Sequence, residues 1–187
     1  ALWLHGQELD VTAAEVLSVG LAPIPARWVP GHRDGIAALR FERPVPRGAV
    51  TLHLTFNGRL NRHLEGLYRV ENSGNTYAFT QFEAISARRA FPCFDEPRFK
   101  TPFDLSVVTA RDHEAVTNTP ETSSADRDDG RRVHRFATTE PLPTYLLAFA
   151  VGPLDIVEAP PLPPNDIRPR AIPLRGVAAR GKGPFLQ

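Results

Sequence analysis

The sequence predicts an all-β domain, and three observations support this prediction. The chain contains 19 proline and 13 glycine residues, and they separate short stretches rich in Val, Leu, Phe, Tyr and Thr, as in strands joined by turns. These stretches recur about every 8 to 15 residues, a spacing that suits β-sandwiches. Between Ala49 and Phe56, apolar and polar residues alternate, which indicates a strand with one buried face. We therefore expect a β-sandwich of curved, mainly antiparallel sheets without long helices.

The expected strands follow one another along the chain with turn-forming residues between them. Leu2 and Leu4 give the opening residues a strand-like pattern. The segment 123–132 is polar and contains an Asp-Gly pair, so we expect a solvated hairpin turn there. Further strands are expected at 35–43, 49–59, 66–70, 76–83, 103–110, 115–119, 132–139, 145–152 and 154–158.

The chain is expected to form one β domain over residues 1–158, followed by a tail. A chain of 187 residues with 42% hydrophobic content is long enough for a single sizeable core. Residues 159–187 are rich in Pro and Gly and basic, so we expect a linker or tail toward a further domain, with polyproline conformation at 159–164. The absence of methionine and the start within a strand pattern favour a fragment of a longer protein.

Composition excludes several classes of partner. With 22 basic and 21 acidic residues the net charge is +1, so no electrostatic footprint for nucleic acid is present. The apolar run at 146–152 is far shorter than a membrane span, and we expect a soluble chain. Cys93 is the single cysteine, so no intrachain disulfide is possible and the compartment is not revealed. A cytoplasmic location is slightly favoured.

No histidine or cysteine predicts a metal site or a nucleophile. The segment His113–Thr117 begins like the zinc motif HExxH, but Thr117 replaces the second histidine and the β-branched residues favour a strand. Cys93 lies between Pro92 and Phe94, where a buried and inert thiol is expected. The sequence also contains no phosphate-binding glycine loop and no Gly-x-Ser-x-Gly elbow.

The stretch 80–100 is the densest in chemically capable residues. Gln81 and Glu83 stand two residues apart, so on a strand both face one side and can line a pocket. The simpler interpretation is an exposed strand edge in which Arg88 or Arg89 pairs with the acidic turn at 95–96. Residue spacing alone favours this simpler interpretation.

A family resemblance changes that balance. Gln81-Phe82-Glu83, the run 87–97 (ARRAFPCFDEP) and Phe99-Lys100 closely resemble the signature block of the first domain of the aminopeptidase N family of zinc metallopeptidases. Other segments resemble the family in the right order along the chain: 66–69 (GLYR), 117–120 (TNTP) and 143–149 (PTYLLAF). The resemblance covers residues 2–158, and the family's opening strand pair before Leu2 is missing, which leaves an early sheet edge open.

The resemblance implies a fold and a role. In this family the first domain is a saddle-like β assembly packed on a thermolysin-like catalytic domain. Glu83 is implied to accept the α-ammonium group of a peptide substrate, and Gln81 to add a hydrogen-bonding wall beside the first residue. The HExxH zinc site, a Gly-x-Met-Glu-Asn loop and an oxyanion-stabilising Tyr are implied to lie beyond Gln187. This chain is then expected to bind no zinc and to be inactive alone.

Other residues of the block receive structural roles, and other functions stay open. We expect Arg88 and Arg89 to form ion pairs or to pack between domains, and Phe91, Phe94 and Phe99 to fill the core or a domain interface. The favoured parent is an aminopeptidase that removes neutral or basic amino-terminal residues. The alternatives are a noncatalytic scaffold or binding module of the same fold and an epoxide hydrolase of the same family.

Overall fold

The computed structural model describes residues 1–186 and confirms the all-β prediction. These residues form fourteen strands and three short 3-10 helices, and no helix among them is long and apolar enough to cross a bilayer. The chain divides into two compact units. The first contains residues 1–69, 79–104 and 138–148, and the second contains residues 70–78, 105–137 and the residues from 149 onward.

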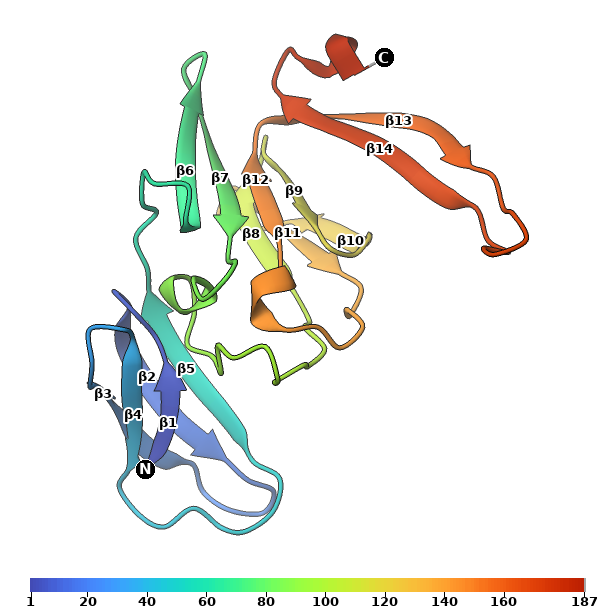
Figure 1. Cartoon of the computed structure of the whole chain (residues 1–187). Coiled ribbons are helices and arrows are strands. Elements are labelled where there is room, and N and C mark those ends of the chain that lie inside the picture. The colour runs from blue at the N-terminus through green and yellow to red at the C-terminus, as the bar shows by residue number, and fades with distance from the viewer. Residues whose placement is uncertain (187) are drawn as a thin grey trace. The chain divides into compact units, whose positions relative to one another are not determined.

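The first unit is built on a five-stranded antiparallel sheet with the order β1-β4-β3-β2-β5 (Figure 1). Its strands are β1 (Leu2–His5), β2 (Asp10–Leu17), β3 (Ile24–Pro30), β4 (Ile36–Phe41) and β5 (Thr51–Asn57). β5 shows the expected alternation of half-buried and exposed residues along its whole length. β1 lies at the edge of the sheet, where His5 also forms a bridge with Cys93.

The core of the first unit gathers apolar residues from every part of that unit's chain. Leu39 and Ala37 of β4 are completely buried, and Phe82, which follows the last strand of the unit, is 2% exposed. Burying a side chain of the size of Leu or Phe contributes about 1.5–3 kcal/mol. Two short helices, η1 (Ala87–Arg89) and η2 (Thr144–Leu146), also belong to this unit.

One hairpin is divided between the units. It consists of β6 (Gly66–Asn72) and β7 (Asn75–Gln81), and residues 70–78 around its turn belong to the second unit. β6 and β7 are part of a four-stranded sheet with the order β6-β7-β12-β9, which also contains β9 (Glu114–Thr117) and β12 (Phe149–Gly152). The strand expected at 145–152 therefore begins only at Phe149, because residues 144–146 form η2.

The second unit corrects the prediction for residues 123–132. Most of this segment is strand, since β10 (Glu121–Asp126) pairs with β11 (Arg131–Phe136) and the turn is limited to the residues between them. β11 also pairs with β8 (Ser106–Ala110), which completes a three-stranded sheet. Every residue of β10 is exposed, so this edge strand has no apolar face that could reveal it in the sequence.

The segment after residue 158 contains further strand structure. β13 (Leu154–Leu162) pairs with β14 (Ile172–Ala179), and η3 (Gly183–Leu186) follows. Residues 159–162 of the expected polyproline run are thus part of a strand pair. Pro160 and Pro161 fall where the register shifts between Ala159 and Leu162, and at such a bulge the missing N–H groups remove no ladder hydrogen bond.

Candidate functional site

Gln81 and Glu83 lie at the end of β7 in the first unit. The strand expected at 76–83 ends at Gln81, and Glu83 opens the turn that follows, so the strand spacing that predicted a shared face does not apply to Glu83. Both side chains are exposed, and Phe82 between them is buried. The peptide bond between Glu83 and Ala84 is cis. Within residues 1–186 neither the Gln81 amide nor the Glu83 carboxylate has a hydrogen-bond or ion-pair partner, so both polar groups are available to a ligand.

An aromatic anchor holds the end of β7 in place. The Phe82 ring meets Phe91 edge-on at a centroid distance of 5.9 Å, and Phe91 meets Phe103 in the same way at 6.4 Å. Edge-to-face pairs of this kind add about 0.5–1.5 kcal/mol to the stabilisation from area burial. Phe91 therefore packs inside the first unit. Of the two roles expected for it, this is the core-filling one.

An ion pair fixes the segment behind the turn. The simpler sequence interpretation correctly paired Arg88 with the acidic turn, but it expected an exposed pair and the observed one is buried. Arg88 Nε donates to Asp95 Oδ2 at 2.8 Å, and the two side chains are only 8% and 1% exposed. Arg88 Nη1 also donates to the Asp34 carbonyl oxygen at 2.6 Å, while Asp95 Oδ1 accepts from Thr144 Oγ1 at 2.6 Å. Such a pair is tolerated in a dry interior because both charges have their hydrogen-bonding sites filled.

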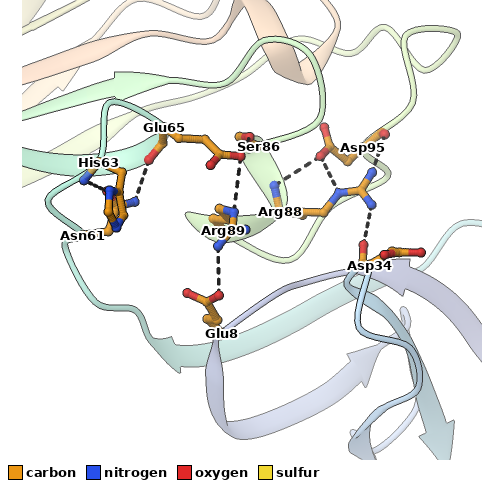
Figure 2. A network of polar contacts seen from close by, with 9 residues as sticks. All are labelled: Glu8, Asp34, Asn61, His63, Glu65, Ser86, Arg88, Arg89 and Asp95. Carbon is orange, nitrogen blue, oxygen red and sulfur yellow. Dashed lines mark hydrogen bonds and ion pairs between the residues drawn. The ribbon is translucent and has the colours of Figure 1, made fainter.

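Arg89 has other partners than the acidic turn at 95–96. Its Nη1 lies 2.9 Å from Glu8 Oε1, and its Nε lies 3.5 Å from Glu65 Oε1. The same Glu65 oxygen accepts a hydrogen bond from Ser86 Oγ at 2.7 Å. Figure 2 shows Arg88 between Asp95 and Asp34, and Arg89 between Glu65 and Glu8. The two neighbouring arginines thus connect η1 to different parts of the first unit.

Two exposed phenylalanines, Phe94 and Phe99, lie on either side of the acidic turn. Phe94 and Phe99 are 40% and 41% exposed, and their ring centroids lie 5.3 Å apart. Arg98 stacks over Phe99 and pairs with Glu96 at 2.9 Å. Unlike Phe91, these two phenylalanines do not fill the core of the described chain, so only the domain-interface expectation for them remains open.

His5 and Cys93 lie beside the buried ion pair. The Asp95 backbone N–H donates to His5 Nδ1 at 3.2 Å. Burial, together with the positive charge of Arg88, lowers the pKa of His5, so the neutral imidazole that accepts this bond is favoured. Burial is also the main cause that raises the pKa of the Cys93 thiol. A protonated and partly buried thiol is a poor nucleophile, in agreement with the expected inert role.

The described residues offer no metal site. The segment that resembled HExxH lies on strand β9 from Glu114 to Thr117, so its side chains do not follow helical spacing. Among residues 1–186 no three His, Cys, Asp or Glu side chains gather in a group that could hold a metal ion. The residues present therefore do not fit a zinc ion, and no chemical step can be assigned to a metal on this part of the chain.

Sequence reasoning missed four partners of this network, namely Glu8, Asp34, Glu65 and Thr144. Their contacts span 81, 54, 21 and 49 residues respectively. One signal was present for Glu65, since it directly precedes the GLYR match that begins β6. Thr144 lies in η2 and within the 143–149 match, whereas Glu8 and Asp34 occupy ordinary turn positions. For these three residues, the tertiary fold alone decides the partner.

Comparison with known proteins finds relatives over most of the chain. Residues 1–146 match the family model of the peptidase M1 N-terminal domain. Aminopeptidase M1-C of Oryza sativa subsp. japonica is 36% identical over 171 residues, which cover 89% of this chain and 19% of that protein. Aminopeptidase N of Acetobacter pasteurianus is 39% identical over 127 residues, covering 65% and 36%. Aminopeptidase N of Bos taurus is 36% identical over 126 residues, covering 64% and 13%. The chain thus spans about a fifth of the length of the rice relative.

Proposed function

Because the chain belongs to the peptidase M1 family through its N-terminal domain, we propose that it is part of a zinc aminopeptidase and binds the amino terminus of the peptide substrate. In this proposal Glu83 accepts the α-ammonium group and Gln81 lines the site of the first residue. The zinc ion and the residues that cleave the bond are placed in the remaining part of the polypeptide, with residues 159–187 leading toward it. This chain alone is then inactive.

The observation that carries the proposal is the state of the Glu83 side chain. Its carboxylate is exposed and has no partner within residues 1–186, although the neighbouring segments are rich in arginine. The adjoining Phe82 is 2% exposed and the following Ser86 is 3% exposed, so the exposed turn is attached to rigid positions on both sides. An unpaired carboxylate on an anchored backbone is well suited to a cationic ligand, because little backbone reorganisation accompanies binding.

The chemistry of a peptide amino terminus matches this arrangement. An α-amino group has an ordinary pKa of about 7.7–8.0 and carries a positive charge at neutral pH. A hydrogen bond between this ammonium and a carboxylate is charge-assisted and contributes about 1.5–3 kcal/mol. The Gln81 amide supplies both a donor and an acceptor for neighbouring polar groups of the substrate. Recognition of the charged end would restrict cleavage to the first residue.

Substitution of Glu83 in the full-length enzyme tests the proposal. Glu83→Gln keeps the size of the side chain and removes its charge, so kcat/KM for an aminoacyl reporter should fall about tenfold or more. Glu42→Gln is the matched control, because Glu42 is also exposed and has no ion-pair partner among residues 1–186. The control should retain full activity. Unchanged kinetics for Glu83→Gln would remove the proposed role.

A further inference from the structure

The segment that carries Glu83 is an exposed turn between two buried anchors. Glu83, Ala84 and Ile85 are all exposed, and the residues on either side of them are buried. The Ser86 backbone N–H donates to the Phe82 carbonyl oxygen at 2.8 Å and closes the turn. Since this single turn joins fixed ends, the position of Ser86 determines where the three exposed residues lie.

A side-chain hydrogen bond from another part of the chain fixes Ser86. Its hydroxyl donates to Glu65 Oε1 at 2.7 Å across 21 residues of sequence. Hydrogen bonds to an ionised carboxylate are shorter and stronger than neutral ones. Arg89 Nε approaches the same oxygen at 3.5 Å, which orients the Glu65 carboxylate toward η1, as Figure 2 shows.

Glu65 itself lies in a loop with its own internal hydrogen bonds. The Asn61 side-chain amide donates to the Glu65 carbonyl oxygen at 2.6 Å, and Asn61 Oδ1 accepts from the His63 backbone N–H at 2.7 Å. The Glu65 backbone N–H donates to the His63 carbonyl oxygen at 2.8 Å. The loop therefore presents the Glu65 carboxylate from a fixed backbone, which is what a positioning group requires.

From this geometry we infer that Glu65 is a positioning residue for substrate capture, acting on Glu83 through Ser86, an inference that rests on the proposed function. The ion pair between Glu65 and Arg89 itself contributes little to folding. The Glu65 side chain is 51% exposed and that of Arg89 is 26% exposed, and exposed ion pairs contribute little to folding. The hydrogen bond from Ser86 to Glu65 acts on the Glu83 turn in particular, because Ser86 is the residue that closes this turn.

The test uses Glu65→Ala in the full-length enzyme. Loss of the acceptor for Ser86 should raise KM for an aminoacyl reporter about tenfold, with kcat within about twofold of wild type. The inhibition constant of an unreactive amino acid amide should rise by the same factor. The thermal midpoint should fall by about 2–4 °C, because the buried Ser86 hydroxyl loses its acceptor. Should Glu65→Ala fail to fold, Ser86→Ala, which deletes only the donor hydroxyl, serves the same purpose.

Two further variants serve as matched controls. Glu65→Gln retains an oxygen acceptor for Ser86 and should rescue KM to within about threefold of wild type. Glu8→Ala removes the other partner of Arg89 but leaves the Ser86 bond in place, so KM should not change. Equal effects of Glu8→Ala and Glu65→Ala would contradict the inference.

Combination with Glu83→Gln separates this inference from the proposed function. If Glu65 acts through Glu83, Glu65→Ala should cause no further loss once residue 83 is glutamine. Two results would overturn the positioning role and leave the proposed function intact. One is a full and additive loss in the double variant. The other is normal capture by Glu65→Ala while Glu83→Gln weakens capture. Normal capture by Glu83→Gln itself would instead refute the proposed function.

Discussion

Two clusters of arginine and aspartate in this chain have the same chemistry and very different surroundings. In the first unit, Arg88 and Asp95 form a buried pair whose side chains are 8% and 1% exposed. In the second unit, Asp129 pairs with Arg127 and Arg131 at the tip of the β10–β11 hairpin, where the side chains are 37% to 56% exposed. Burial, and not the number of ion pairs, determines which cluster organises the fold around it.

The two clusters also differ in what they connect. The buried pair joins η1 to the β3–β4 turn and to η2, through the Asp34 carbonyl oxygen and the Thr144 hydroxyl. The hairpin cluster joins residues that are already neighbours in a short turn. We conclude that the first cluster supports the candidate site, whereas the second serves mainly as a solvated turn.

The largest expected effect is the loss of one member of the buried pair. Asp95→Ala should reduce the free energy of unfolding by about 3–5 kcal/mol, because it leaves the Arg88 guanidinium buried without its counter-ion. Urea denaturation of the chain measures this loss. The double variant Arg88→Met with Asp95→Leu removes both charges and should lose less. A double variant that is less stable than Asp95→Ala would contradict this explanation.

A smaller effect is expected at Thr144, which is 5% exposed and donates to Asp95. Thr144→Val keeps the shape of the side chain and removes the hydroxyl. The loss of a hydrogen bond to a charged group should cost about 1.5–3 kcal/mol of unfolding free energy, measurable by the same titration. Thr122→Val is the control, because the Thr122 hydroxyl donates from exposed strand β10. If both variants lose equal stability, burial is not the deciding factor.

A pH-dependent effect is expected from His5, beside the buried pair. Its folded-state pKa lies below the ordinary value of 6.5, so near and below that pH the unfolded chain binds a proton that the folded chain does not. The protonation of His5 therefore costs no stability well above pH 6.5, and it lowers the free energy of unfolding progressively as the pH falls below that value. The thermal midpoint of His5→Gln should decline less between pH 7 and pH 5. An equal decline in His5→Gln and in the wild type would contradict this linkage.

The smallest effect is expected in the exposed hairpin. Hydrogen bonding to Arg131 lowers the pKa of Asp129 to about 2, so its ion pairs persist to low pH and weaken only as the pH approaches that value. Because the cluster is open to solvent, Asp129→Asn should leave the thermal midpoint near neutral pH unchanged. Calorimetry at low and high salt checks this expectation. A loss comparable to that of Thr144→Val would remove the distinction between the clusters.

The sequence predicted the strands whose apolar pattern is regular. β5 keeps its alternation over its whole length, whereas β2 was missed because a register shift between Val11 and Ala13 interrupts its period. β3 begins and ends near Pro25 and Pro30, which resemble turn signals. β14 lies in a Pro- and Gly-rich region, and among residues 1–186 it pairs only with β13, so its surroundings indicated a tail.

The candidate site was predictable as far as local spacing determines it. Local spacing predicted the Arg88–Asp95 pair, which spans only seven residues. Gln81 and Glu83 were singled out by the family resemblance, and their binding role stays a prediction. Glu65 and Thr144 could not be found in this way, since their partners come from distant segments. Local patterns reveal contacts between residues that are close in the sequence. The positioning contacts join distant segments and depend on the tertiary fold.

The most direct test of the central claim compares two competitive ligands of the full-length enzyme, an amino acid amide and its analogue without the α-amino group. The ratio of their inhibition constants isolates the contribution of the ammonium group. If Glu83 binds that group, the preference for the amine in Glu83→Gln should be about tenfold smaller than in the wild type. An unchanged preference would contradict the proposed role of Glu83 and, with it, the positioning role of Glu65.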